Sequence, residues 1–279
     1  MRVRYSFSSR KTGRARAEKT CQHRKPFPKL VLEVIKTSDI IIEVLDARFI
    51  EESRNIESEE LIKNSEKKII FVFNKADLAD ITKVMQKIEL HSLKPYVFVS
   101  CKRREGIGKL RKLIKIDVSR LGIKGRKVNV GVIGYPNTGK SSLINVLLGR
   151  ASARKAAEAG FTKGIQKLKL TDDILILDTP GVIPEEETGT EKEKYIKQAK
   201  IGVRTADRAK DPEMIVSELV KEYPSIEKFY NIESNRDSEV LIEKLGRKRN
   251  FLIKGGKIDV DRTARLILKD FQEGRIEAI

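Results

Sequence analysis

The residues with the most distinctive chemistry form the stretch GYPNTGKS, Gly134 to Ser141, which follows the apolar run KVNVGVI and precedes the helical pattern SSLINVLL. A glycine-rich turn between a strand and a helix offers successive backbone N–H groups and a helix N-terminus to phosphate groups. The Lys140 ammonium would then reach the β and γ phosphates of a nucleotide, and the Ser141 hydroxyl would bind Mg²⁺. We therefore predict a phosphate-binding loop with ligand contacts from Pro136, Asn137, Thr138, Gly139, Lys140, Ser141 and Ser142.

A second motif, DTPG, ends the apolar run DILIL at Asp178 and continues to Gly181. A carboxylate at a strand end can hold Mg²⁺ through water, and the Gly181 N–H can donate to a γ-phosphate. Thr162, in EAGFTKG, lies between the two motifs, and its hydroxyl can complete the Mg²⁺ shell in the triphosphate state. A plain loop hydroxyl is the alternative for Thr162. We expect the Mg²⁺ ligands to be Ser141, Thr162 and Asp178.

The run FVFNKAD carries three side chains suited to guanine, Asn74, Lys75 and Asp77, at the end of another apolar segment. The Asp77 carboxylate can accept from guanine N1–H and from the 2-amino group together. Adenine offers neither donor, so a wrong purine leaves a buried charge unpaired. Asn74 can bond the other edge of the base, and the Lys75 stem can cover the ring.

A further apolar run, PYVFV, is followed by Ser100, Cys101 and Lys102. This stretch suits a backbone contact to guanine O6, with the Lys102 stem over the ring. Because this motif is short, it indicates guanine binding only in combination with the other three motifs.

These motifs need a scaffold that brings them together. Apolar runs at DIIIEVLDAR, KKIIFVF, PYVFVS, KVNVGVIG and DILILDTP predict buried strands, and helical patterns such as DLADITKVMQKIEL separate them. The helix at GIGKLRKLIKIDVSRLG has an apolar face of Leu110, Leu113, Ile114, Val118 and Leu121. This alternation predicts an α/β fold: a doubly wound, mostly parallel sheet covered by helices on both faces.

After Pro184 the strand signal disappears. The stretch EEETGTEKEKY reads as a charged loop or linker, and the patterns beyond it are helical. The last helix should bury a stripe of Val260, Ala264, Ile267 and Phe271 and end at Gly274. We predict a basic N-terminal arm at residues 1–27, the α/β domain at 28–189 and an all-helical C-terminal domain at 190–279.

The net charge of +18 is concentrated in two stretches. Residues 1–29 carry ten Lys or Arg against one acid, and residues 102–127 carry eleven against two. Each phosphate that such a cluster neutralises releases a counterion, so clustered cations favour a polyanion, here structured RNA. The alternative is a basic surface that only keeps the protein soluble.

Cys21 and Cys101 show no metal-ligand spacing and suggest no disulfide framework. The N-terminal stretch lacks the apolar core of a signal peptide, and no run approaches the 18 apolar residues of a membrane span. We expect a cytoplasmic protein without a membrane partner.

The order of the motifs is unusual. They resemble the five nucleotide-binding motifs of GTPases, but NKAD and SCK precede the phosphate loop. This order, with DARFIEESRN (Asp46 to Asn55) before NKAD, resembles the circularly permuted GTPases of the YlqF/YawG kind, which act in large ribosomal subunit assembly. The resemblance covers residues 28–185, and GGKIDVDRTARLILKDFQEGRI is similar to the closing helix of those proteins.

The resemblance implies a circularly permuted P-loop GTPase fold, bound GTP or GDP, Mg²⁺ and an archaeal source. Permutation leaves the site intact, because all ligand loops of such a sheet gather at the carboxyl ends of the strands. The segment after DTPG now leads directly into the helical domain, so nucleotide state should set the orientation of that domain.

Four residues are catalytic candidates: Lys140, Thr162, Asn137 and His23. The residue after DTPG is Val182, where Ras-like enzymes carry a water-orienting Gln. Some bacterial relatives have a histidine in a Pro-Gly-His-Met motif near the position of His23, but CQHRKPF does not match it, and an exposed residue in the arm is the alternative. In GTPases similar around GxPNxGKS, the asparagine helps to coordinate K⁺ beside the phosphates.

The leading hypothesis is a monomeric, intrinsically slow, Mg²⁺-dependent GTPase that binds ribosomal RNA of the large subunit and assists its assembly. One alternative is a nucleotide-gated RNA-binding scaffold with negligible hydrolysis. Another is a GTPase acting on the small subunit. Permuted relatives of that kind carry an oligonucleotide-binding barrel and a zinc site, for which the 28 leading residues and two scattered cysteines leave no room.

Overall fold

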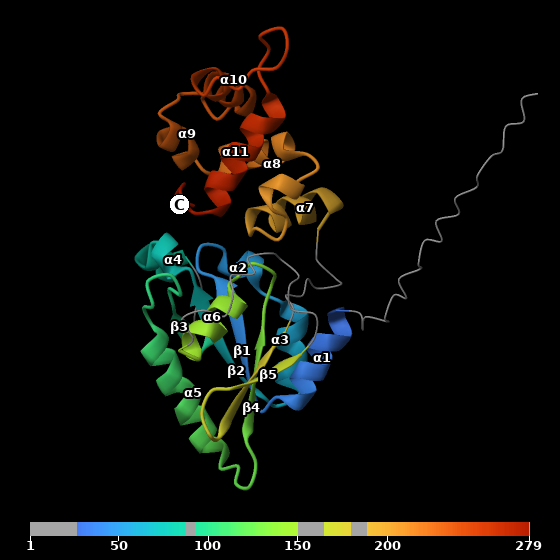
Figure 1. Ribbon diagram of the computed structural model, residues 1–279, viewed down its shortest axis with the longest axis vertical. Coiled ribbons are helices and arrows are strands. Elements are labelled where there is room, and N and C mark those ends of the chain that lie inside the picture. The colour runs from blue at the N-terminus through green and yellow to red at the C-terminus, as the bar shows by residue number, and fades with distance from the viewer. Residues whose placement is uncertain (1–26, 88–92, 150–164, 180–188, 279) are drawn as a thin grey trace, which may run out of the picture.

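The computed structural model describes residues 27–87, 93–149, 165–179 and 189–278 and is built around a six-stranded sheet (Figure 1). The spatial order of the strands is β3 (Tyr96–Phe98), β2 (Lys68–Asn74), β1 (Ile40–Asp46), β4 (Val128–Ile133), β6 (Ile174–Asp178) and β5 (Gln166–Lys169). Neighbouring strands are parallel except β5, which is antiparallel to β6. The predicted mostly parallel sheet is confirmed.

Helices cover both faces of this sheet. The helices and turns of this part are α1 (Phe27–Thr37), α2 (Ile50–Ser53), α3 (Ile56–Asn64), η1 (Ala76–Leu78), α4 (Ile81–Lys87), α5 (Ile107–Leu121) and α6 (Lys140–Leu147). On one face, Ile40, Ile42 and Val44 of β1 pack with Leu110 and Ile114 of α5 and with apolar residues of α6. On the other face, Ile41 packs with α1 and α3. Because β1 is buried along its whole length, its sequence IIIEVLD shows no alternation of apolar and polar residues.

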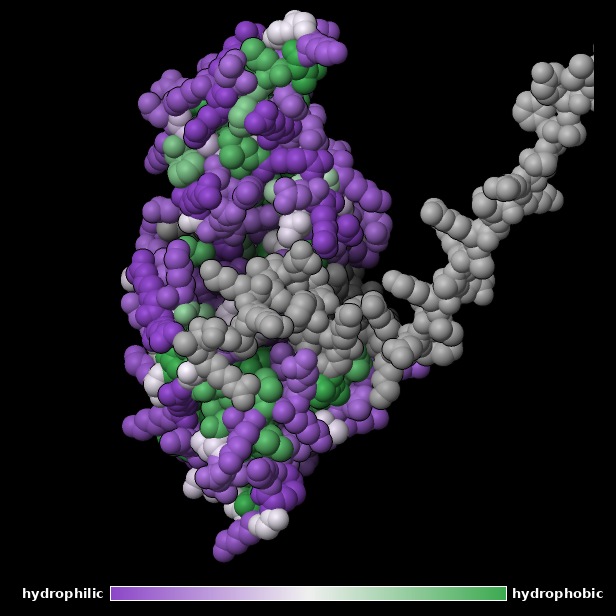
Figure 2. All heavy atoms as spheres, in the orientation of Figure 1, coloured by the Kyte–Doolittle hydropathy of each residue, from purple (hydrophilic) through white to green (hydrophobic). Residues whose placement is uncertain are grey.

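The second part of the chain is helical, as predicted. It comprises α7 (Glu191–Lys200), η3 (Ala206–Arg208), α8 (Pro212–Glu222), α9 (Ser225–Tyr230), α10 (Ser238–Lys248) and α11 (Val260–Gln272), grouped beside α2 and α4 in Figure 1. Ala264, Ile267 and Phe271 of α11 are fully buried, whereas Val260, expected on the same stripe, is 37% exposed. Gly274 adopts the left-handed conformation one residue after the C-cap, as expected. Hydrophilic side chains cover most of the visible face of this part (Figure 2).

Two sequence-based expectations need correction. The stretch predicted as a charged loop or linker contains the start of α7, because Thr190 and Glu193 form a capping box that satisfies the first free N–H groups of the helix. Strand β5 was not predicted, because Gln166, Lys167 and Lys169 are exposed and give no apolar pattern. Our proposed boundary at residues 189/190 falls at the N-cap of α7.

Two aromatic residues of the α/β part belong to the hydrophobic core of the helical part. Phe49, just after β1, and Tyr135, just after β4, are 2% and 0% exposed and pack in one cluster with residues of α7, α8, α10 and α11. Phe49 stacks on Phe271 with ring centroids 5.8 Å apart. The two parts of the chain therefore share buried apolar surface at the carboxyl edge of the sheet.

Glu43 lies at the centre of β1 and is fully buried. Its Oε1 accepts from the backbone N–H of Asn55 at 2.9 Å, while Oε2 has no partner among the described residues. Burial, followed by the nearby charge of Glu59, raises the pKa of Glu43 well above its ordinary value. Burial of this carboxyl group therefore favours its protonated form in the folded protein.

We predict that Glu43→Gln raises the free energy of unfolding, and more so at pH 8 than at pH 5. A raised folded-state pKa means that stability is fully present below the ordinary pKa of 4.5 and is lost as pH rises towards the folded value. The loss is about 1.4 kcal/mol per pH unit over that window. Glutamine keeps the shape and the bond from Asn55 but needs no proton. Urea unfolding at the two pH values, with the exposed Glu57→Gln as control, measures the difference; an equal gain at both would contradict the prediction.

Candidate nucleotide-binding site

The phosphate loop connects β4 to α6 and is held in shape by its own bonds. The Thr138 hydroxyl is fully buried and donates to the Tyr135 carbonyl at 2.9 Å. Gly139 has a φ of 98°, and a Cβ there would lie 2.2 Å from Asn74 Nδ2. Only glycine fits this close approach between two loops.

Lys140 begins α6 and is 6% exposed. Its ammonium donates to the carbonyls of Gly134 and Tyr135 at 2.9 and 2.7 Å. Burial lowers the pKa of Lys140 to about 7, against the opposing attraction of Asp178. A phosphate group beside this ammonium would supply the negative charge that its buried position lacks.

Asp178 and Ser141 fit the donor set of a Mg²⁺ ion bound with a nucleotide. Asp178 ends β6 and is 6% exposed, and its Oδ1 has no partner among the described residues. Burial raises the pKa of Asp178, while the Lys140 charge lowers it. Ser141 and Ser142 are exposed on the first turn of α6, and their hydroxyls bond no described residue. Mg²⁺ prefers such oxygen ligands together with phosphates and water.

Asn74 joins the base-reading and phosphate-binding loops. Its Nδ2 donates to the Thr138 carbonyl at 2.8 Å, and its Oδ1 accepts from the Cys101 N–H at 3.4 Å. The residue is 2% exposed. The expected bond from Asn74 to the edge of the base stays a prediction.

Asp77 is oriented by the neighbouring loop. The Ser100 hydroxyl donates to Asp77 Oδ1 at 2.6 Å and accepts from the Arg103 N–H at 3.0 Å. Burial, followed by the Asp77 charge, raises the pKa of Cys101 to about 12, so the thiol stays neutral. Lys102 is exposed at the rim of the same loop. The structure thus brings both predicted guanine motifs to adjacent strand ends.

The outer side of the phosphate loop faces the helical part. Asn137, in the left-handed region with a φ of 64°, donates from Nδ2 to the Gly202 carbonyl just after α7. Its Oδ1 bonds no described residue. Next to it, Tyr135 lies under the ammonium of Lys197, 5.3 Å from the ring centroid, and Pro136 is partly buried.

Sequence reasoning missed a charged cluster below the base loop. Asp46 Oδ2 accepts from Lys75 Nζ at 2.7 Å and from Arg48 Nη2 at 2.8 Å. Arg48 also donates from Nη1 to the carbonyls of Phe271 and Gln272 at the end of α11. The only signal in the sequence was an acid and an arginine two residues apart at a strand end. Among the other candidates, Thr162, Gly181 and His23 lie outside the described residues.

We predict that binding of GDP takes up close to one proton at pH 8.5. Lys140 has a pKa of about 7 in the free protein, so it is mostly neutral at that pH and must be protonated to pair with phosphate. Affinity should then fall up to about tenfold per pH unit above 7. Calorimetry in two buffers of different ionisation enthalpy measures the uptake. Lys140→Arg, which stays charged, should show none, and absence of uptake in the unmodified protein would refute the assignment.

Comparisons with known proteins agree with this geometry. The family model described as "50S ribosome-binding GTPase" matches residues 129–243. The chain is 38% identical over 253 residues to "Uncharacterized GTP-binding protein MJ1464" of Methanocaldococcus jannaschii, covering 90% of this chain and 66% of that protein. It is 33% identical over 251 residues to "Nucleolar GTP-binding protein 2" of Saccharomyces cerevisiae, covering 88% of this chain and 51% of that protein. The chain thus spans between half and two thirds of the length of these relatives.

Solved structures show the same fold. The GDP-bound structure of TM YlqF superposes with a TM-score of 0.62 at 25% identity, covering 88% of this chain and 94% of that one. GNP-bound YlqF from T. maritima gives the same TM-score at 24% identity, with 89% and 94% covered. With the guanine-reading loops before the phosphate loop in the chain and beside it in space, the protein belongs to the circularly permuted GTPases of the YlqF kind.

Proposed function

We propose that this protein is a Mg²⁺-dependent GTPase that binds ribosomal RNA and assists assembly of the large ribosomal subunit. The observation that carries the proposal is the bond from Asn74 to Thr138, which fixes the guanine-reading end of β2 against the phosphate loop after β4. Ligand loops at the carboxyl ends of parallel strands are the usual nucleotide site of such sheets. Asp77 reads guanine, Lys140 binds the phosphates, and Ser141, Thr162 and Asp178 hold the metal.

The names of the similar proteins support the ribosomal part of the proposal. The matching family is described as binding the 50S ribosome, and the yeast relative is named as nucleolar. We extend these descriptions to this chain as a cytoplasmic, monomeric protein whose partner is the large subunit or its precursor. Among the residues that the structure describes, none of the helices has both the length and the apolar content of a membrane span.

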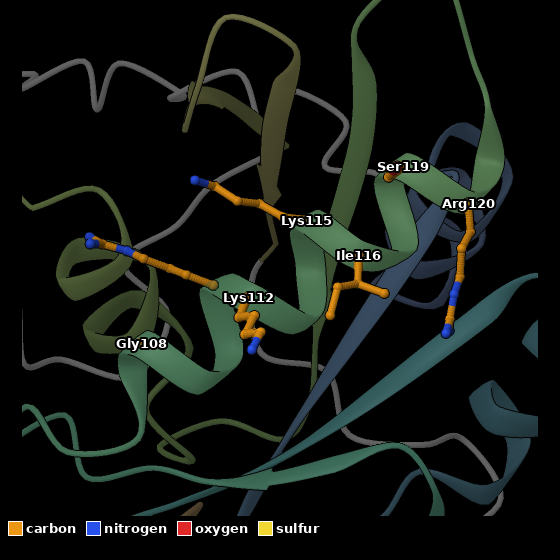
Figure 3. A pocket seen from close by; sticks show the side chains of 7 residues that line it. Gly108, Lys112, Lys115, Ile116, Ser119 and Arg120 are labelled. Carbon is orange, nitrogen blue, oxygen red and sulfur yellow. The ribbon is translucent and has the colours of Figure 1, made fainter.

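The exposed face of α5 fits a polyanion. Lys112, Lys115 and Arg120 project from successive turns around Ile116 and Ser119, lining a hollow of about 600 Å³ (Figure 3). Lys109, Lys112 and Lys115 are exposed and form no ion pair with any described residue. Solvated, unpaired cations on one helix can each neutralise a phosphate and release a counterion. This supports an RNA-binding role for residues 102–127.

Contacts of the phosphate loop with the helical part support a change in that part when the bound nucleotide changes. Tyr135 is buried in the core of the helical part, and Asn137 bonds Gly202 in the same part. A change in the loop when phosphate leaves would therefore act directly on the helices. We propose that nucleotide state sets how the helical part lies against the sheet.

The hydrolysis step has several candidate contributors. Lys140, together with Thr162 bound to the Mg²⁺ ion, would stabilise charge on the transferred phosphoryl group. Asn137 Oδ1, which bonds no described residue, is suited to a K⁺ ion beside the phosphates. His23 remains a candidate for placing water.

We predict that GTP turnover is slow alone, rises at least tenfold with large ribosomal subunits, and is faster in KCl than in NaCl. The subunit would order the catalytic loops, and K⁺ would add positive charge at Asn137. Phosphate release measured with each purified subunit in each salt tests this. Asn137→Ala should lose the preference for K⁺ but keep GDP binding.

The outcomes separate the alternatives. Turnover that stays negligible with both subunits, while RNA binding depends on nucleotide, would favour the RNA-binding scaffold. Stimulation and co-sedimentation with the small subunit alone would favour the small-subunit GTPase. Equal turnover in KCl and NaCl would remove the role of K⁺.

We predict that changing Lys109, Lys112 and Lys115 together to Gln weakens binding to ribosomal RNA and lowers the slope of log K against log salt by about 2 to 3, because three phosphate contacts are lost. Filter binding over a salt series measures both. GDP affinity should not change.

The matched control is Lys192, Lys221 and Arg247 changed to Gln. It removes the same charge from exposed residues that are already paired with glutamates on the helical part. If the two triple variants lose RNA affinity equally, net charge rather than the α5 face is responsible.

A further inference from the structure

Asp46 is a charged residue sealed inside the protein beside the base-reading loop. Its exposed fraction is 0%, and it ends β1 in register with Asn74 at the end of β2. Four donors meet its carboxylate: the N–H and Nε of Arg48 on Oδ1 at 3.1 and 3.0 Å, and Arg48 Nη2 and Lys75 Nζ on Oδ2 at 2.8 and 2.7 Å. Such full pairing is what a buried charge requires.

The electrostatics keep this carboxylate ionised. Burial alone would raise the pKa of Asp46, but the charges of Lys75 and Arg48 hold it well below its usual range. Asp46 is therefore ionised at neutral pH. This negative charge holds the side chains of Lys75 and Arg48 in place.

Lys75 is the partner with a second task. It is the lysine of NKAD, has a left-handed φ of 61°, and keeps 24% of its side chain exposed. With Cα fixed in the loop and Nζ fixed on Asp46, the methylene stem can take few paths between them. A free lysine side chain carries about 2 kcal/mol of rotamer entropy, which ordering on a ligand would consume. Holding the stem in advance removes that cost from binding.

Arg48 connects the same carboxylate to the helical part. Its Nη1 donates to the Phe271 carbonyl at 3.1 Å and faces the Gln272 carbonyl at 3.4 Å, where a cation stabilises the C-terminal end of α11. The side chain of Gln272 in turn bonds Ala199, Arg204 and Ala206. These residues flank Gly202, the partner of Asn137 in the phosphate loop.

We propose that Asp46 is a positioning residue for guanine recognition: it holds the Lys75 stem across the base site and, through Arg48, ties the position of Lys75 to the docked end of α11. The inference rests on the proposed binding of guanine nucleotides. Asp46 is fully buried, so this role is indirect and needs no contact with the nucleotide.

The test compares GDP affinities of Lys75→Met, Lys75→Arg, Asp46→Asn and the double variant Asp46→Asn/Lys75→Met. Lys75→Met keeps an apolar stem but loses the tether, and we expect about tenfold weaker binding; Lys75→Arg keeps the ion pair and should stay within about threefold. Asp46→Asn should also weaken binding about tenfold. The double variant should bind no more weakly than Lys75→Met, because both changes remove one interaction.

The control is Asp39→Asn. Asp39 lies at the opposite end of β1 and binds Arg126 through two bonds of 2.8 and 2.7 Å, so it is a more exposed carboxylate–arginine pair far from the ligand loops. It should leave GDP affinity unchanged. The Lys75 variants leave the Asp46–Arg48 pair intact, so they remain informative even if Asp46→Asn does not fold.

Hydrogen exchange tests the connection to α11. GDP should slow exchange of the amides of residues 271–276 in the unmodified protein but not in Lys75→Met. Three results would overturn the inference. The first is a GDP affinity of Lys75→Met within twofold of the unmodified protein, and the second is a double variant in which the losses of GDP affinity from the two substitutions multiply. The third is equal protection of the α11 amides by GDP in Lys75→Met and in the unmodified protein. If the unmodified protein fails to bind GDP, the proposed function itself fails instead.

Discussion

The bond between Asn74 and the Thr138 carbonyl is the contact on which the candidate site depends. The two residues are 64 positions apart, on loops that leave β2 and β4 with β1 between them. Glycine at position 139 permits this approach, since any Cβ would displace the amide. The bond sets the spacing between the groups that would read the base and those that would bind phosphate. A purine nucleotide of fixed length can only satisfy both if this spacing is fixed first.

The sequence was sufficient to predict five of the six strands and to place two motifs at strand ends, because those features are local. GYPNTGKS and NKAD each follow a strand, and fully buried strands such as β1 are rich in apolar residues without alternation. Features that depend on distant partners could not be predicted. No pattern around Asp46 indicates that the Lys75 and Arg48 side chains both bind its carboxylate. No pattern around Tyr135 indicates that its ring packs with the residues of the helical part. The helix α7 was not predicted, because its many charged residues leave no clear apolar stripe. The capping box at Thr190 is weaker evidence for a helix than such a stripe would be.

The helical part is more than an appended module. Phe49 and Tyr135 contribute to its core from loops of the α/β part, so its apolar surface is completed by the neighbourhood of the ligand loops. Lys200 reinforces the joint, donating to Glu52 of α2 and Glu222 of α8 at 2.8 and 2.7 Å. The Lys200 side chain is only 8% exposed, so a movement of the joint that takes both carboxylates away from its ammonium is unfavourable. A joint with few positions would suit the proposed response of the helical part to nucleotide state.

The strand order β3-β2-β1-β4-β6-β5 also divides the sheet into two halves that are each continuous in the chain. Residues 40–98 supply β1 to β3, residues 128–178 supply β4 to β6, and the seam between them is the pairing of β1 with β4. The base-reading loops belong to the first half and the phosphate loop to the second. A bound nucleotide would therefore act as a clamp across this seam, adding about 2.7 kcal/mol to the stability of the closed sheet at a hundredfold excess over Kd. During synthesis, the half that would read the base is made before the half that would bind phosphate, so the nucleotide site and the sheet would be completed in the same step.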